Sequence, residues 1–443
     1  MAEATLAPEA RAELLARWRA ARAHTDALFR LVTPEGLYVR TIPERHRLIF
    51  YLGHLEAFDW NLVGKAALGL EPFQEEFDRL FAFGIDPVNG NLPTDRPSDW
   101  PSIEEVQKYN QRLQERLDTH LRAADWADPK LPYLHGGQIM HVALEHRWMH
   151  AETLVYLIHH LPLDHKLPPP QLPPPPAVPL KLRQAEIPAG KATLGLERAG
   201  AHPFGWDNEF DPHTVDVPPF AIDAFPVTNA QYLDFLRAGG YQDKTLWSEA
   251  GWQWKQERGL AHPHFWTPRN GQWSLRARFA DIPLPSDWPV YVSYAEASAY
   301  ARWAGKNLPS EAQWHRAAYG TPPGNERLYP WGNDPPEPHR GNFDFARWDP
   351  TPVTAHPAGG SAFGVHDLLG NGWEWTRTVF APFPGFHPFP FYPGYSANFF
   401  DGKHYVMKGG SMRTAACLLR RSFRNWFQFH YPYVPAKFRL VKE

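Results

Sequence analysis

The sequence predicts a multidomain protein, in which an N-terminal helical bundle is followed by a C-terminal α+β domain. Apolar residues recur at helical spacing through most of residues 9–160. The chain then enters a proline-rich stretch, with seven prolines among the ten residues Leu167–Pro176. Beyond it, short apolar runs alternate with Gly, Pro, Trp and Asn, which favours short strands joined by ordered loops. A length of 443 residues is sufficient for two or three domains of this kind.

The N-terminal part predicts an antiparallel four-helix bundle with a long connection between its second and third helices. The second helix is expected to open with a capping box from Thr41 to Glu44, and the third with one from Ser102 to Glu105. The four predicted helices span residues 9–32, 41–70, 102–124 and about Gln138–His160. The third helix carries one apolar stripe, formed by Val106, Tyr109, Leu113, Leu117 and Leu121.

The proline-rich segment marks the predicted domain boundary. Consecutive prolines favour an extended polyproline II conformation, so we expect a stiff linker over residues 166–182 between domains at 1–165 and 183–443. The clearest helix of the second domain is "SYAEASAYARWAGK", in which Ser293 and Glu296 have capping-box spacing.

Charge, hydropathy and cysteine content exclude several classes of function. A net charge of −3 argues against a general nucleic-acid binder, which needs a basic excess. Neither a secretory signal nor an apolar run of about 18 residues is present, so we expect a cytoplasmic protein that does not span a membrane. Cys417 is the single cysteine, which leaves His, Asp and Glu as the available metal ligands.

Two histidines in the predicted fourth helix, His146 and His150, are the strongest candidates for a metal site. Residues four apart lie on one face of a helix, and His54, in the middle of the second helix, offers a third imidazole. A zinc-protease site needs Glu directly after the first His, where this chain has Arg147. Helix geometry turns Glu152 away from His150, so Glu152 is a poor metal ligand and is better suited to contacting a ligand or a neighbouring helix. Three imidazoles suit zinc, iron(II) or copper, and the spacing also fits a core pair without metal.

The helix phrases "LGHLEAFDWNL" and "LEHRWMHAETL" resemble the DinB-like bundle of the ergothioneine-type sulfoxide synthases. The C-terminal half resembles the formylglycine-generating-enzyme fold, which is of C-type-lectin type. The segments that carry this second resemblance are "DNEFDPHTVDVPPFAIDAFPVTNAQYLDFLRAGGY", "PVYVSYAEASAYARWAGKNLPSEAQWHRAAYG", "YPWGND", "GVHDLLGNGWEWTRTVF", "VMKGGSMRT" and "SFRNWF". Together the two halves cover nearly the whole chain.

The resemblance implies a non-haem iron(II) centre held by His54, His146 and His150. It also implies O2-dependent attachment of a thiol sulfur to imidazole C2 of hercynine. Asn425 and Trp426 are similar to the hercynine-binding pair of that family. Formylglycine-generating enzymes use a pair of cysteines, so the lone cysteine of this chain argues against aldehyde formation.

The chain departs from the family pattern where the thiol donor binds. Phe427 replaces an acidic residue, Met149 replaces a frequent Gln, and the loop "GIDPVNGNLPTDRPSDWPS" contains a single arginine, Arg96. Such a pocket favours a neutral sugar over an amino-acid thiol. The sequence is therefore more similar to the selenoneine synthase branch, in which selenium from a selenosugar is joined to hercynine.

The loop "FHPFPFYPGY" aligns with the region that holds the active-site tyrosine of the family. Phe389 or Phe391 takes the place of that tyrosine, so we expect Tyr392 or Tyr395 to relay protons. Nearby, Trp373 and Trp375 are candidates either for contact with a quaternary ammonium or for core packing, and core packing is favoured.

Three other functions agree with parts of the pattern. A sulfoxide synthase would use cysteine or γ-glutamylcysteine as the donor. A zinc-dependent DinB-like thiol transferase would use the same three histidines without oxygen. A lectin-like binding module would not depend on them at all.

Overall fold

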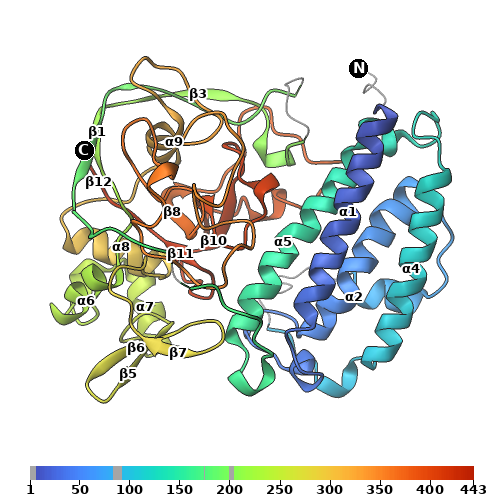
Figure 1. The fold of residues 1–443 in the computed structure, drawn as a ribbon, viewed down its shortest axis with the longest axis horizontal. Helices are drawn as coiled ribbons and strands as arrows, with labels where there is room; N and C mark the ends of the chain where they lie inside the picture. Colours follow the sequence, from blue (N-terminus) through green and yellow to red (C-terminus); the bar gives the residue numbers. More distant parts are fainter. Residues whose placement is uncertain (1–5, 83–91, 174, 199–203) are drawn as a thin grey trace. The chain divides into compact units, whose positions relative to one another are not determined.

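The chain packs as two compact units, residues 1–170 and 171–443. The computed structural model describes residues 6–82, 92–173, 175–198 and 204–443. Unit 1 is helical and unit 2 combines strands with shorter helices, so the predicted fold class is confirmed (Figure 1). The change from one unit to the other falls inside the proline-rich segment. Among the described residues, no helix is both long enough and apolar enough to cross a membrane.

Unit 1 is built around four long helices, in which α1 packs against α5, and α2 packs against α4 and α5. Its α-helices are α1 (Pro8–Phe29), α2 (Leu48–Asp59), α3 (Glu75–Leu80), α4 (Ile103–Ala123) and α5 (Gln138–His160). The α4 stripe predicted from the sequence is buried along its whole length. Ser102 caps α4, accepting a hydrogen bond from the backbone N–H of Glu105, as the capping box predicts.

The predicted second helix is wrong at both ends. It begins at Leu48, with Arg47 at the N-cap and no side-chain cap. Upstream, Arg40 and Arg47 donate to the carbonyl groups of Arg45 and Tyr38, and both contact the Asp95 carboxylate. These contacts hold the segment before Leu48 outside the helix, so the Thr41–Glu44 capping box does not form. At the other end, α2 continues as a π-helix over Trp60–Ala67, which an α-helical pattern does not predict.

Unit 2 contains four α-helices and twelve strands among its described residues. The helices are α6 (Asn229–Arg237), α7 (Glu249–Glu257), α8 (Tyr294–Trp303) and α9 (Glu311–Tyr319). The strands are β1 (Gln184–Ile187), β2 (Gly190–Leu194), β3 (His213–Val217), β4 (Phe220–Asp223), β5 (Trp266–Arg269), β6 (Gln272–Arg276), β7 (Asp281–Pro283), β8 (Gly372–Val379), β9 (His404–Gly410), β10 (Asn425–Gln428), β11 (Ala436–Lys437) and β12 (Val441–Lys442). Ser293 caps α8 through the predicted box with Glu296.

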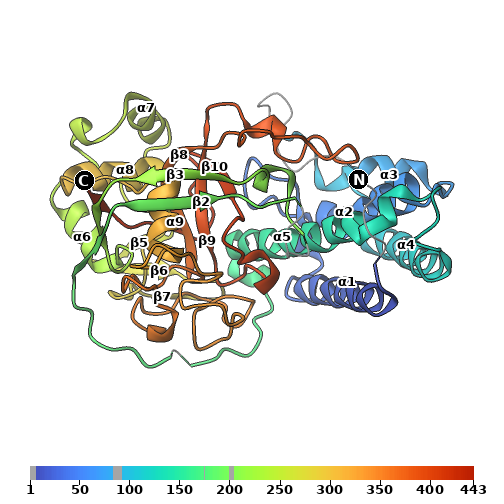
Figure 2. The same cartoon turned by 90° about the horizontal axis from the view of Figure 1, so that it is seen from above.

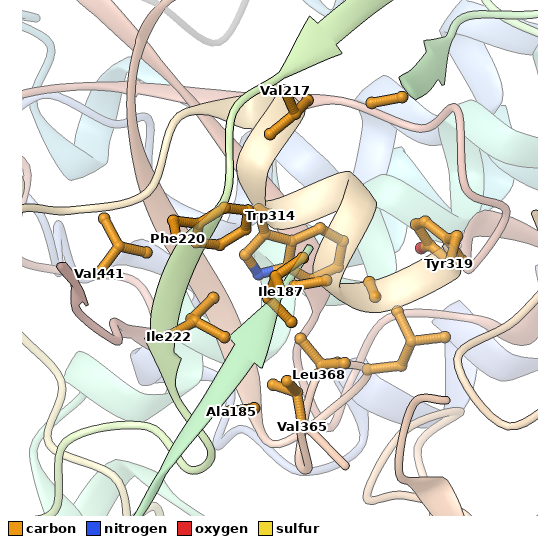
Figure 3. Packing of buried hydrophobic residues seen from close by; sticks show 14 of the residues in the cluster. Ala185, Ile187, Val217, Phe220, Ile222, Trp314, Tyr319, Val365, Leu368 and Val441 are labelled. Carbon is orange, nitrogen blue, oxygen red and sulfur yellow. The ribbon is translucent and has the colours of Figure 1, made fainter. Parts of the chain in front are cut away.

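The strands of unit 2 form several small sheets rather than one large one. The largest sheet among the described residues has four strands in the order β10-β9-β8-β11, with β10 at one edge. Helix α9 packs against the β2–β3 hairpin and against β8 and β9 (Figure 2). On α9, Trp314 is fully buried and centres an apolar cluster that includes Ile222 and Leu368 (Figure 3). Trp314 also donates to Glu374 of β8 at 2.8 Å, so α9 joins this cluster to β8, which pairs with β9, and β9 pairs with β10.

The proline-rich segment makes hydrogen bonds to unit 2. Arg347 donates to the Pro173 carbonyl at 2.6 Å, and Thr354 donates to the Val178 carbonyl at 2.7 Å. Proline lacks an N–H group but keeps its carbonyl acceptor. The predicted stiff linker is thus hydrogen-bonded to the rest of unit 2 along part of its length.

The buried stripe of α4 gives a direct test of the bundle. Leu113→Ala removes a fully buried side chain and should lower the free energy of unfolding by about 2–5 kcal/mol. Urea unfolding of the full chain, followed by circular dichroism at 222 nm, measures this change. Lys108→Ala, an exposed position on the same helix, should leave the unfolding curve within about 0.5 kcal/mol of wild type. Equal effects of the two variants would contradict the assigned face of α4.

Candidate metal centre

Helices α2 and α5 bring three buried histidines together. His54 lies on α2, and His146 and His150 lie one turn apart on α5. Each side chain is 5% exposed, and each offers one ligand atom such that all three atoms lie within 4.8 Å of one another. No other group of His, Cys, Asp or Glu among the described residues meets this distance criterion. The residues suggested by helical spacing thus converge on one point of unit 1.

Hydrogen bonding fixes the orientation of His54. Its Nδ1 lies 2.7 Å from the backbone carbonyl of Phe81, which can only accept, so Nδ1 carries the proton. The unprotonated Nε2 is then the atom available to a metal. An N–H donated to a carbonyl is the usual support of a metal-binding histidine, because it sets both the tautomer and the ring orientation.

The two α5 histidines are held by packing. The ring of His146 stacks on Phe58, with centroids 3.4 Å apart and planes 10° apart. His150 contacts the Tyr51 ring at 5.7 Å. The buried Nδ1 atoms of both histidines make no hydrogen bond within the described part of the chain. Buried polar atoms without partners are costly, so this pair is suited to an external ligand such as a metal ion.

The electrostatics of the cluster favour neutral imidazoles. Burial lowers the pKa of His54 to about 4. Burial, together with the neighbouring histidines, holds the pKa values of His146 and His150 well below the usual value. Since metals bind the unprotonated ring, all three side chains are ready to coordinate at neutral pH. The donor set of three nitrogens fits zinc, iron(II) or copper.

A cavity of about 290 Å³ adjoins His54 within unit 1. Its remaining lining residues are Phe58, Asn61, Lys65, Asp78, Arg79 and Ala82. Lys65 lies 3.8 Å from the buried Asp78 carboxylate, while Arg79 pairs with Glu75 on the surface of α3. The cavity therefore has apolar walls together with charged groups of both signs. Met149, predicted to face the donor, is half-buried on α5 directly before His150.

In unit 2, the predicted hercynine-binding pair lies on the edge strand β10. Asn425, Trp426 and Phe427 are half-buried and pair with β9. The Trp426 ring stacks on Phe380 with a centroid distance of 4.1 Å. Phe427 stacks on Tyr431 at 4.9 Å. Alternation along a strand directs the neighbouring rings of Trp426 and Phe427 to opposite faces of the sheet.

The two candidate tyrosines differ in their distances from neighbouring aromatic rings. Tyr395 contacts the Trp426 ring at 5.6 Å and stacks on Trp206 at 3.9 Å. Tyr392 lies 5.7 Å from Tyr395 and 6.5 Å from Trp206. Phe389 is 5% exposed and lies 6.3 Å from the Trp206 ring. Tyr395 is thus the tyrosine brought next to the predicted substrate-binding strand.

Sequence reasoning missed the role of Trp206 and Asp207 in holding this loop. Trp206 is fully buried beneath Tyr395, and Asp207 accepts a hydrogen bond from Ser396 Oγ at 2.5 Å. Burial raises the pKa of Asp207 to about 6. The adjacent Trp206 and Asp207 were the only hint in the sequence that this segment holds the loop. Ser396, which donates to Asp207, lies almost 190 residues away in sequence. The core role favoured for Trp373 and Trp375 is confirmed, since both are buried on β8.

Part of the loop that lacks an arginine cluster, residues 84–91, lies outside the described residues. Arg96, further along the same loop, is exposed, and its backbone N–H donates to Asp99.

Comparison with known proteins assigns each unit to a family. Residues 175–443 match the sulfatase-modifying factor enzyme 1-like domain, and residues 17–154 match the DinB superfamily. The chain is 45% identical to "Hercynine oxygenase" of Mycobacterium tuberculosis over 236 residues, covering 53% of this chain and 54% of that protein. It is 28% identical to "Ergothioneine biosynthesis protein 1" of Neurospora crassa, covering 96% of this chain and 57% of that protein.

A mouse protein named "Inactive C-alpha-formylglycine-generating enzyme 2" is 34% identical over 49% of this chain and 77% of its own length. The chain spans about half the length of the hercynine oxygenases it matches. It belongs to the sulfatase-modifying factor enzyme 1-like family, and its N-terminal part also matches the DinB superfamily.

Proposed function

We propose that this chain is a non-haem iron(II) enzyme that uses O2 to join selenium from a selenosugar to imidazole C2 of hercynine. The observation that carries the proposal is the convergence of three buried, neutral histidines within 4.8 Å. The mycobacterial relative named "Hercynine oxygenase" supports hercynine as the acceptor.

His54, His146 and His150 would hold the iron, which when bound supplies the chemistry of O2 activation. Three protein ligands leave room for substrate and O2 at such a metal. The protein's part is to keep the imidazoles neutral, fix their orientation and exclude water, which burial and the Phe81 carbonyl accomplish. For a selenosugar selenol, the C2–H and Se–H bonds would be replaced by a C2–Se bond, and O2 would take up four electrons, with one oxygen leaving as water and the other bound to selenium as a selenoxide. The bond between selenium and the sugar would remain intact and break in a later step.

Asn425 and Trp426 are the proposed hercynine-binding residues. Asn425 Oδ1 accepts the backbone N–H of Trp426 at 2.8 Å, which leaves its amide N–H groups to donate to the hercynine carboxylate. Aromatic faces recognise quaternary ammonium groups, and Trp426 with Tyr395 offers such faces to the trimethylammonium group. Tyr395 is the preferred proton relay, with Tyr392 as the second candidate.

The donor proposal rests on the apolar character of Met149 in unit 1 and, separately, of Phe389 and Phe427 in unit 2. None of these side chains can pair with an amino-acid carboxylate or ammonium group, whereas aromatic rings stack well on sugars. One observation favours the alternative of a thiol donor such as cysteine or γ-glutamylcysteine. Lys65 and Arg79 line the cavity beside His54 and suit the carboxylate of such a thiol.

Metal binding is tested first by His146→Ala. Removal of one of three ligands should abolish stoichiometric iron binding. The measurement is iron per chain by mass spectrometry after anaerobic reconstitution and gel filtration. The matched control is His120→Ala, because His120 Nδ1 bonds to the Arg116 carbonyl at 2.7 Å, outside the cluster; it should retain iron. Wild-type protein that keeps zinc and consumes no O2 with hercynine would favour the thiol transferase instead.

Donor identity is tested by product analysis. Iron-loaded protein is given hercynine and O2 with a selenosugar, cysteine or γ-glutamylcysteine, and products are identified by mass. We expect a selenium-bearing hercynine product from the selenosugar and none from the thiols. A sulfoxide formed from a thiol would assign the chain to ergothioneine synthesis.

Phe427→Asp tests the contact with the donor. A carboxylate introduced at this half-buried position, facing a neutral sugar, should lower kcat/KM for the selenosugar by about tenfold or more. Phe279→Asp, a half-buried phenylalanine that packs on Trp348, serves as the control and should have little effect. Equal losses in both variants would indicate general destabilisation rather than donor recognition.

A further inference from the structure

Arg147 occupies a position that the proposed chemistry leaves unexplained. It directly follows His146 on α5, yet its side chain is only 1% exposed. The guanidinium contacts Glu56 Oε1 at 3.0 Å and Asp59 Oδ2 at 2.6 Å, and donates to the Leu55 carbonyl at 2.9 Å. All three of these partners belong to α2, the helix that carries His54.

The same charged cluster reaches the other two long helices of unit 1. Thr25 of α1 lies 3.3 Å from Arg147, and Trp18 of α1 donates to Asp59 at 3.0 Å. Gln114 of α4 donates to Glu56 at 3.1 Å. One guanidinium therefore joins a network with contributions from all four long helices.

The charges of the network nearly cancel. Arg22, stacked on Trp18, adds a second guanidinium 3.5 Å from Glu56. Burial opposes ionisation of Glu56, but Arg147 and Arg22 hold its pKa below the usual value. Two arginines thus face the carboxyl groups of Glu56 and Asp59. Helices α2 and α5 are joined by directional contacts, and little net charge is placed beside the histidines.

A buried ion pair adds little stability over a well-packed apolar pair, and its better-attested use is to specify one register between elements. An arginine cannot serve as a general base, because it stays protonated. Both points argue for a geometric role. A slip of α5 along α2 would break two charge-assisted hydrogen bonds at once and displace His146 and His150 from His54.

We propose that Arg147 is a positioning residue, which clamps α5 to α2 and so fixes the distance between His54 and the two α5 histidines. The inference rests on the proposed metal site. It assigns no part in bond making to Arg147.

Cobalt(II) binding to the full-length, metal-free protein tests the clamp, because the visible spectrum of cobalt reports ligand geometry. Arg147→Met should weaken cobalt affinity by about 10–100-fold, the usual effect of losing support behind the ligands, and alter the spectrum. Arg147→Lys, which reaches one carboxylate at a time, should restore part of both. Glu56→Gln and Asp59→Asn should shift affinity in the same direction by smaller factors, and they keep the test valid if Arg147→Met fails to fold.

Leu113→Ala is the matched control for stability. It should destabilise the bundle while leaving the cobalt spectrum unchanged and the affinity within about threefold, since α4 carries none of the three histidines. Wild-type cobalt behaviour in Arg147→Met, or equal losses in Leu113→Ala, would overturn the clamp.

Hydrogen exchange in the metal-free protein separates failure of the clamp from failure of the metal site. Arg147→Met should raise exchange in α2 and α5 more than in α4. If wild-type protein binds no cobalt, the metal proposal fails, and the exchange pattern alone decides for or against the clamp.

Discussion

The burial of three imidazoles at one point between α2 and α5 is the constraint on which the rest of unit 1 depends. Each ring must be desolvated, and burial at this point holds all three pKa values below normal. Hydrogen bonds offset this cost of desolvation for only one of the three rings. His54 has a carbonyl partner, whereas the Nδ1 atoms of His146 and His150 have no hydrogen-bond partner in the described residues. Buried imidazole nitrogens without hydrogen-bond partners are unfavourable in a hydrophobic core but suitable for binding a ligand. The geometry of these three side chains is therefore a stronger indication of function than the helical fold is.

The surrounding bundle is organised to tolerate that cost. Apolar packing along the α4 stripe and between α1 and α5 supplies non-directional stability. Apolar packing tolerates small shifts of one helix along another. A metal site does not tolerate them, because its ligand atoms must keep fixed distances. The charged contacts of Arg147 with α2 add the direction that apolar packing lacks. Stability and register therefore come from different residues of the same four helices.

Sequence patterns predicted those features that are local. The extent of α5, the capping box of α4 and the buried stripe follow from spacing within one turn or one helix, and all appear in the structure. The Thr41–Glu44 box failed because Arg40, Arg47 and Asp95 engage that segment from a distance in sequence. The three histidines were found because two share one turn and the third lies mid-helix. The Phe81 carbonyl that orients His54 and the Glu56 carboxylate that pairs with Arg147 carry no signal in the sequence, since any residue has a carbonyl and a helix surface often has a Glu.

The division of chemistry between the two units follows from residue content. The relatives of unit 2 include proteins named as formylglycine-generating enzymes, one of them inactive. This chain cannot carry out chemistry that needs a pair of cysteines, because Cys417 is its single cysteine. Unit 2 retains a core centred on Trp314 that supports β8 and β9, and β9 supports the edge strand β10, with its half-buried asparagine and aromatic rings. In the proposed function this strand binds hercynine, while O2 activation is assigned to unit 1, which holds the three-histidine cluster found among the described residues.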